Sequence, residues 1–230
     1  MARQTYSERR WPDTPEFSSV LRGMKEGSST RLLELVWQGY DRFCDEVLCD
    51  MDCSLEDEDL ERDITQHLEP MIADEMTGYE PFCVQHGPFE RESRLGAPAE
   101  PPQYDIAFKL RCNPRVMWPL EAKVLRTDGA VAEYIEELKS NFLTCRYSPF
   151  SSEAAMLGYL LSGIPEKALG SIARKGGWEL APHRYFPNRD HRKSDHRRTV
   201  PLGESYPVEF RCHHLIFRLA GLTASGTLSG

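Results

Sequence analysis

The chain has 230 residues, of which 40% are hydrophobic and 28% charged, and 36 acidic against 28 basic side chains give a net charge of -8. This balance fits one globular domain with additions and excludes disordered and collagen-like chains. The excess of acids argues against a protein that coats nucleic acid nonspecifically.

The N-terminal quarter of the chain predicts two helices. Residues 1–28 are polar and contain Pro and Gly, which indicates a weakly ordered arm. Apolar residues at helical spacing then predict an amphipathic helix over roughly 30–50. The segment Ser54 to Asp57 resembles a capping box and opens a second helix over roughly 55–75.

Strands dominate the middle of the chain. Aromatic and β-branched residues predict strands at 79–86, 104–110 and 116–125, and turn chemistry around Asn113 joins the last two. A helix begins near Thr127. These strands are expected to pair in antiparallel order.

The C-terminal part continues the alternation. A short apolar run at 154–161 predicts a buried strand, and Pro165 and Gly176-Gly177 mark the two ends of the next helix. A final strand is expected at 208–219. The complete order, α-α-β-β-β-α-β-α-β, predicts a mixed α/β domain with a crossover to the fourth strand.

Two acidic residues lie in the middle of otherwise apolar strands. Asp105 and Glu121 are 16 positions apart with Asn113 midway, so a turn centred on Asn113 places the two carboxylates opposite each other. Opposed side chains on neighbouring strands have Cβ atoms roughly 4.5–5.5 Å apart, where like charges repel. The pair needs a compensating cation, and a hard divalent metal with oxygen ligands meets that need.

Lys123 is predicted to share a face with Glu121, because side chains alternate along a strand. Its ammonium would lie beside the metal and near a bound phosphate or attacking water, while Ala122 points to the other face. The alternative interpretation is a salt-bridge cluster on a half-exposed sheet. The position of Asp105 and the flanking apolar residues favour the metal site.

The segment Pro102-Gln103-Tyr104-Asp105 followed by Glu121-Ala122-Lys123 resembles the split motif of the PD-(D/E)XK nuclease superfamily. Tyr104 stands where the family usually has proline, although Pro101-Pro102 is close by. The element order from about 55 to 161 is similar to the family core. The resemblance implies a restriction-endonuclease-like core, with a central mixed β-sheet flanked by helices in the order α-β-β-β-α-β.

This resemblance implies metal-dependent hydrolysis of a phosphodiester. Asp105, Glu121 and the main-chain carbonyl of Ala122 would hold Mg²⁺, with Mn²⁺ as the alternative ion. Lys123 would orient the water and stabilise the charge that develops on the phosphoryl group.

Glu61 is predicted to add a further acid to this site. It shares a helical face with Ile64, Thr65 and Leu68, and an acid on a core-facing stripe is costly unless it is paired or near a metal. The segment is similar to the helix that supplies an extra acid in Holliday-junction resolvases and many restriction enzymes. The alternative is a glutamate favoured near a helix N-terminus by the macrodipole.

Charge is segregated along the chain. Residues 45–61 contain nine acids and no Lys or Arg, whereas residues 183–198 contain six Arg or Lys, three His and two Asp. The basic stretch predicts a polar loop with nucleic-acid phosphate contacts from Arg192, Lys193, Arg197 and Arg198. A solvated surface loop is the alternative.

The histidines are not predicted to bind metal. His191 and His196 fall in the basic stretch, where they suit phosphate contact better. Alternation in the last strand sends His213 and His214 to opposite faces, so these neighbours are not expected to form a metal pair.

These features together predict an Mg²⁺-dependent endonuclease that acts on DNA, with restriction or antiviral defence as the role suggested by analogy of fold. RNA cleavage at the same site and a nuclease-fold protein that binds without cutting are the alternatives. The intact Asp-Glu-Lys set favours cleavage. We expect DNA or RNA as partner, together with a second copy of the chain or a subunit of a defence complex.

Three segments are expected: an N-terminal arm and helix at 1–53, a nuclease-like domain at 54–220 and a C-terminal tail at 221–230. Apolar runs are far shorter than the ~20 residues of a membrane span, and no apolar segment follows Met1. The seven cysteines include no CxxC pair. A cytoplasmic protein with no membrane partner is therefore expected.

Overall fold

The computed structural model describes residues 28–90 and 101–219, so most of the expected arm and the expected C-terminal tail lie outside the described residues. The helices are α3 (Ser28–Glu46), α4 (Asp57–Asp74), α5 (Ala132–Glu137) and α6 (Pro165–Gly176). A short 3-10 helix spans Leu48–Asp50, and a π-helical turn continues α5 over Leu138–Phe142.

The strands form one mixed sheet of seven strands in the order β1-β2-β3-β4-β7-β6-β5. Their bounds are β1 (Phe82–His86), β2 (Ile106–Leu110), β3 (Met117–Leu125), β4 (Glu153–Leu160), β5 (Ala181–Pro182), β6 (His191–Arg197) and β7 (Glu209–Arg218). Strands β3, β4 and β7 are parallel, and the other neighbours are antiparallel. The predicted mixed α/β class, the antiparallel β1-β2-β3 unit and the crossover to β4 are confirmed.

The basic stretch 183–198 is not the loop that its composition predicts. Residues 191–197 form β6, which pairs antiparallel with β7 from His191 opposite Leu215 to Arg197 opposite Glu209. Polar side chains of this strand can be buried because the neighbouring strand provides hydrogen-bond partners for them. The Ser194 hydroxyl, for example, lies 2.7 Å from His214 Nε2. Local polarity was therefore a misleading signal.

The start of α4 also differs from its predicted capping. The residue that caps the helix is Glu56, without a side-chain hydrogen bond to the first turn. The Ser54 hydroxyl donates instead to Asp52 Oδ1 at 2.6 Å. Three acids in the first turn, Asp57, Glu58 and Asp59, favour this end of the helix through its macrodipole.

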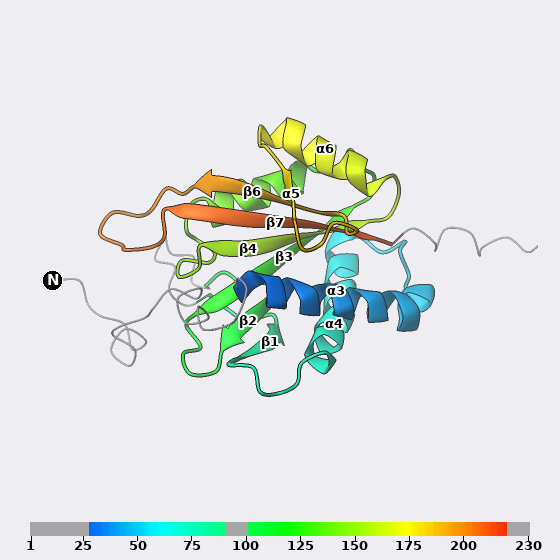
Figure 1. Cartoon of the computed structure of the whole chain (residues 1–230). Helices are drawn as coiled ribbons and strands as arrows, with labels where there is room; N and C mark the ends of the chain where they lie inside the picture. The colour runs from blue at the N-terminus through cyan, green and yellow to red at the C-terminus, as the bar shows by residue number, and fades with distance from the viewer. Residues whose placement is uncertain (1–27, 91–100, 220–230) are drawn as a thin grey trace, which may run out of the picture.

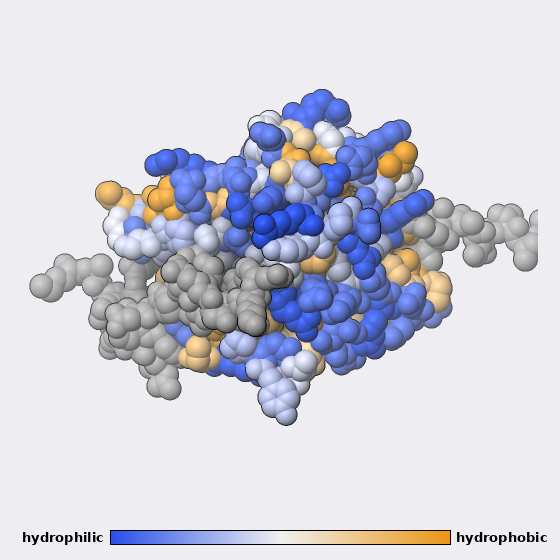
Figure 2. Space-filling view, viewed as in Figure 1, coloured by the Kyte–Doolittle hydropathy of each residue, from blue (hydrophilic) through white to orange (hydrophobic). Residues whose placement is uncertain are grey.

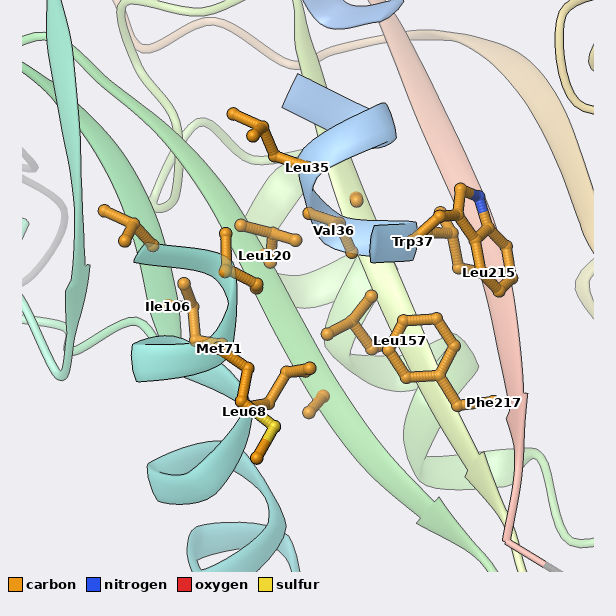
Figure 3. Close-up of a cluster of buried hydrophobic side chains, with 14 of the residues drawn as sticks. Leu35, Val36, Trp37, Leu68, Met71, Ile106, Leu120, Leu157, Leu215 and Phe217 are labelled. Carbon is orange, nitrogen blue, oxygen red and sulfur yellow. The ribbon is translucent and has the colours of Figure 1, made fainter. Parts of the chain in front are cut away.

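Apolar side chains form a layer on each face of the sheet. One layer lies between the sheet and helices α3 and α4, and the other between the sheet and helices α5 and α6. Figures 1 and 3 show α3 and α4 against the sheet, and Figure 3 shows the packed side chains, among them Val36, Trp37, Leu68, Leu120, Leu157 and Phe217. Alternation along β3 follows from this arrangement: Leu120, Ala122 and Val124 face the α3/α4 layer.

Helix α3 belongs to the same core as the sheet. Its residues Leu32, Leu33, Val36 and Trp37 are buried in the α3/α4 layer. The expected boundary at residues 53–54 therefore does not divide the described core, and the other domain boundaries stay predictions.

The visible face over α3 and α4 is mainly hydrophilic (Figure 2). Within the described ranges, no helix combines the length and apolar character that crossing a membrane requires.

Gly39 lies where α3 packs on α4. A Cβ at this position would lie 2.6 Å from Ile72 Cγ1 and 2.9 Å from the Ile72 main-chain nitrogen. We expect Gly39→Ala to lower the free energy of unfolding by ~1–3 kcal/mol, because overpacking must push the two helices apart. Chemical denaturation measures the change.

Gly170→Ala on the exposed side of α6 is the matched control. A Cβ there would have nothing within 4 Å. Removing a glycine from a helix interior should then stabilise the chain by ~0.5–1 kcal/mol. Changes of the same sign in the two variants would contradict a tight α3–α4 contact.

Candidate active site

The site begins where β2 leaves β3. The register pairs Ile106 with Leu120, so Asp105, directly before β2, stands opposite Glu121, as the turn at Asn113 predicts. The Ala122 N–H donates to Asp105 Oδ2 at 2.7 Å. The Asp105 side chain thus accepts the hydrogen bond that a main-chain carbonyl would accept if β2 extended further toward its N-terminal side. The edge of β3 beyond Leu120 is therefore left open to other groups.

Lys123 connects this edge to α4. Its Nζ lies 2.9 Å from Glu61 Oε1 and 3.7 Å from Glu121 Oε1. Glu61 reaches it from the first half of α4, where Leu60, Ile64 and Leu68 anchor the helix in the core. The structure therefore brings all four predicted catalytic residues together, although they come from three separate elements.

A pocket of about 390 Å³ opens over these residues. Glu61, Asp105 and Lys123 line it, together with Glu58, Arg62, His86, Gly87, Gln103 and Tyr104. Glu121 lies behind this lining and is only 5% exposed. The pocket thus lies beside residues that contact the buried Glu121 carboxyl group.

Burial raises the pKa of each acid in the cluster. The pKa of Glu121 is raised well above its ordinary value by burial and by the charge of Asp105. Burial also raises the pKa of Asp105, against the opposing effect of Lys123 and the Ala122 N–H. Burial raises the pKa of Glu61 to about 7, again opposed by Lys123.

Lys123 remains a cation in this setting. Burial alone would lower the pKa of its ammonium, but Glu121, Glu61 and Asp105 outweigh burial and raise it. One ammonium therefore faces three carboxyl groups. Glu121 Oε2 is buried and has no hydrogen-bond partner, so the cluster has an oxygen atom that can serve as ligand to a hard divalent cation.

Three residues near the site were not predicted from the sequence to belong to it. Glu137, at the end of α5, adds to the negative field that raises the pKa of Glu121. His86 and Gln103 line the pocket from the end of β1 and from the residues before β2. The adjacency of Gln103 to Asp105 was a usable signal, whereas His86 meets the site only through the β1–β2 pairing.

The four residues predicted to contact nucleic acid have different environments. Arg192 pairs with Glu166 at 2.9 Å, Arg197 is exposed near Glu209, and Lys193 lies opposite His213 in the β6–β7 ladder. Arg198 is only 4% exposed. None of them lines the pocket around Asp105.

The prediction for Arg198 is wrong. Its guanidinium donates to the main-chain carbonyls of Ser148, Ser151 and Pro207 at 2.8–3.0 Å. Buried arginines are retained when their donors are satisfied in this way. Arg198 therefore fixes the loop before β4, and we withdraw it as a phosphate contact.

The expectation of phosphate contact is wrong for His191 as well. Its side chain is fully buried, with Nε2 3.2 Å from His213 Nδ1. His196 is half-buried, and its Nε2 lies 2.6 Å from the Ser194 hydroxyl. His213 and His214 do face opposite sides of the sheet, as alternation predicts: one contacts Trp118 and the other Tyr134.

Comparison of the chain with models of known protein families finds no match, and searches of curated proteins and of solved structures find no significantly similar protein.

Glu61 gives the metal-free site a distinctive pH dependence. Its pKa is about 7 in the folded chain against an ordinary value of 4.5. Between these values the folded state holds a proton that the unfolded state releases, so stability that is complete below about pH 4.5 is lost as the pH rises toward 7. We expect Glu61→Gln to gain stability relative to wild type over that interval, by at most ~1.4 kcal/mol for each pH unit above about 4.5.

Denaturation at several pH values, after chelator treatment, measures this difference. Glu34→Gln on the exposed side of α3 controls for the loss of one acid from the chain. A wild-type to Glu61→Gln difference that is constant from pH 4.5 to 7 would contradict the raised pKa of Glu61.

Proposed function

We propose that the chain is an Mg²⁺-dependent endonuclease that hydrolyses DNA phosphodiester bonds. The observation that carries the proposal is the joint placement of Asp105, Glu121 and Lys123 with Glu61 beside one pocket. Carboxylates on adjoining strands with a lysine on the second strand are the arrangement that the PD-(D/E)XK resemblance calls for. The antiparallel β1-β2-β3 unit and the crossover to β4 support the same restriction-endonuclease-like core.

The donor set fits a hard cation. The carboxylates of Asp105 and Glu121 and the carbonyl of Ala122 would hold Mg²⁺, with Mn²⁺ as the alternative, and the unpartnered Glu121 Oε2 is available as a ligand atom. Bound there, the ion supplies Lewis-acid polarisation of a phosphoryl oxygen. The same charge would also relieve the repulsion between the two acids.

Lys123 acts in this proposal as a fixed positive charge. Its raised pKa keeps the ammonium protonated, so it serves to orient water and to stabilise the charge that develops on the phosphoryl oxygens. Glu61 is a positioning residue, because its Oε1 accepts a hydrogen bond from the Lys123 ammonium. Its pKa of about 7 also suits it to exchange a proton near neutral pH.

The complete set of site residues favours cleavage over binding alone. A fold used only for binding has no need of one buried and two half-buried acids, since each raised pKa costs stability at neutral pH. DNA is the proposed substrate, and RNA is the second candidate. A cytoplasmic role in restriction or antiviral defence, with a second copy or a defence-complex subunit as partner, follows by analogy of fold only.

Substitution of Lys123 tests the catalytic proposal. We expect Lys123→Met to lower the cleavage rate by at least ~100-fold while Mg²⁺ binding persists, because the lysine stabilises the transition state and does not ligate the ion. Asp105→Asn and Glu121→Gln should lose both. Cleavage is measured on single-stranded DNA, duplex DNA and RNA with and without Mg²⁺, and Mg²⁺ binding by calorimetry.

Lys109→Met is the matched control. Lys109 lies on β2, its ammonium donates a hydrogen bond to Gln85 Oε1, and it does not line the pocket. It should cleave as wild type does. A folded wild-type chain that binds Mg²⁺ but cuts none of the three substrates would favour the binding-only alternative. If the wild-type chain binds no Mg²⁺ at millimolar concentration, the residues form only an ion-pair cluster and the metal-site proposal is wrong.

The outer basic residues of β6 remain candidates for phosphate contact. We expect joint replacement of Arg192, Lys193 and Arg197 by Gln to reduce the salt dependence of DNA binding by ~0.9 in the log–log slope per lost contact. Joint replacement by Gln of three basic residues elsewhere, Arg31 and Arg42 on α3 and Lys175 on α6, is the control for total charge. An unchanged slope in the β6 variant would mean that these three side chains are ordinary solvated surface residues.

A further inference from the structure

A second group of potential ligands lies away from the pocket. His183 follows β5, His191 begins β6 and His213 lies in β7, and one ring nitrogen of each is within 4.8 Å of one in each of the others. All three side chains are buried, with exposed fractions of 7%, 0% and 2%. We call this group the histidine cluster.

We propose that the histidine cluster binds one divalent transition-metal ion, for which zinc is the best fit. Imidazole nitrogen is a ligand that zinc prefers, at 2.0–2.1 Å. Two nitrogens bound tetrahedrally at that distance are roughly 3.3 Å apart. His191 Nε2 and His213 Nδ1 are 3.2 Å apart, so this pair already has the separation that the ion requires.

The surroundings of the cluster support a metal in two further ways. Glu153 Oε2 lies 3.7 Å from His213 Nε2, on the far side of the ring from the contact with His191. A carboxylate there can fix the ring with Nδ1 free to ligate, as outer carboxylates do at zinc sites. In addition, His183 Nδ1 is buried without a hydrogen-bond partner.

Two of the three rings, those of His183 and His191, are held in the neutral form that a metal needs. Burial and the neighbouring His213 and Lys193 lower the pKa of His183 to about 4. Burial, His213 and His183 also lower the pKa of His191. Neutral imidazoles offer a lone pair.

A metal-free hydrogen-bonded chain is the competing arrangement. Trp37 Nε1 can donate to His191 Nδ1 at 3.5 Å, His191 to His213, and His213 toward Glu153. The first contact exceeds the usual 2.7–3.2 Å of such bonds. Metal binding would move the His191 proton from Nε2 to Nδ1 and give up that contact, so the environment of Trp37 reports on the ion.

The test uses the full, untagged chain after metal removal, with Co²⁺ as the probe and millimolar Mg²⁺ present to occupy the carboxylate site. We expect one equivalent of Co²⁺ to give the strong visible absorption of tetrahedral coordination. It should also quench tryptophan fluorescence, since Trp37 and Trp118 lie 6.2 and 6.1 Å from the rings of His191 and His213. Zn²⁺ should displace the signal and raise the melting temperature.

His183→Gln should weaken Co²⁺ binding by more than ~100-fold, because loss of a ligand costs more than loss of an outer partner. His196 lies on the same strand as His191 but outside the cluster, so His196→Gln should bind Co²⁺ as wild type does. If His183→Gln does not fold, Glu153→Gln replaces it, with an expected loss of ~10–100-fold.

Glu121→Gln separates this proposal from the nuclease proposal, because it should abolish Mg²⁺ binding and leave the Co²⁺ spectrum unchanged. No tetrahedral spectrum in the wild type, or an equal affinity in wild type and the tested cluster variant, would overturn the proposal and leave the metal-free chain.

Discussion

The separation of β2 from β3 at Leu120 is the constraint on which the candidate active site depends. Because Asp105 takes the Ala122 N–H with its side chain, the backbone ladder stops without leaving a buried donor unpaired. The remainder of β3 keeps β4 on one side only. Lys123 can therefore reach Glu61 of α4 across the free edge. Had β2 continued to pair, its next residues would occupy the space in which the four side chains meet.

This arrangement costs stability locally and is supported elsewhere. Burial and the neighbouring acids raise the pKa values of Glu121 and Glu61, and a single lysine does not balance these effects. Apolar layers on both faces of the sheet hold β3 and α4 in place despite that repulsion. Such conflict between a local feature and the rest of a fold is expected where chemistry is performed. It also explains why a cation would both stabilise the chain and complete the site.

The sequence predicted those parts of the fold whose signals are local or periodic. Asn113 fixed the register that sets Asp105 opposite Glu121, and the alternation of β3 placed Lys123 with Glu121. Polar residues satisfied from a distance gave no such signal. Ser194 is buried because His214, 20 positions away, meets its hydroxyl, and Arg198 because two of its three acceptors, Ser148 and Ser151, lie 50 and 47 positions earlier.

The two proposed metal sites differ in ligand chemistry, and the sheet keeps them apart. Leu120, Ala155 and His213 are neighbours in register, so the histidine cluster and the acidic site stand at the same height, two strands or roughly 10 Å apart. Glu121 points to the face of the sheet opposite that of Leu120. The sheet, including β4, therefore lies between the acidic site and the histidine cluster. Oxygen ligands select a hard ion and imidazoles a softer one. Because His191 begins the strand that carries Arg192 and Lys193, an ion in the cluster would fix the proposed phosphate-binding strand without touching the reacting groups.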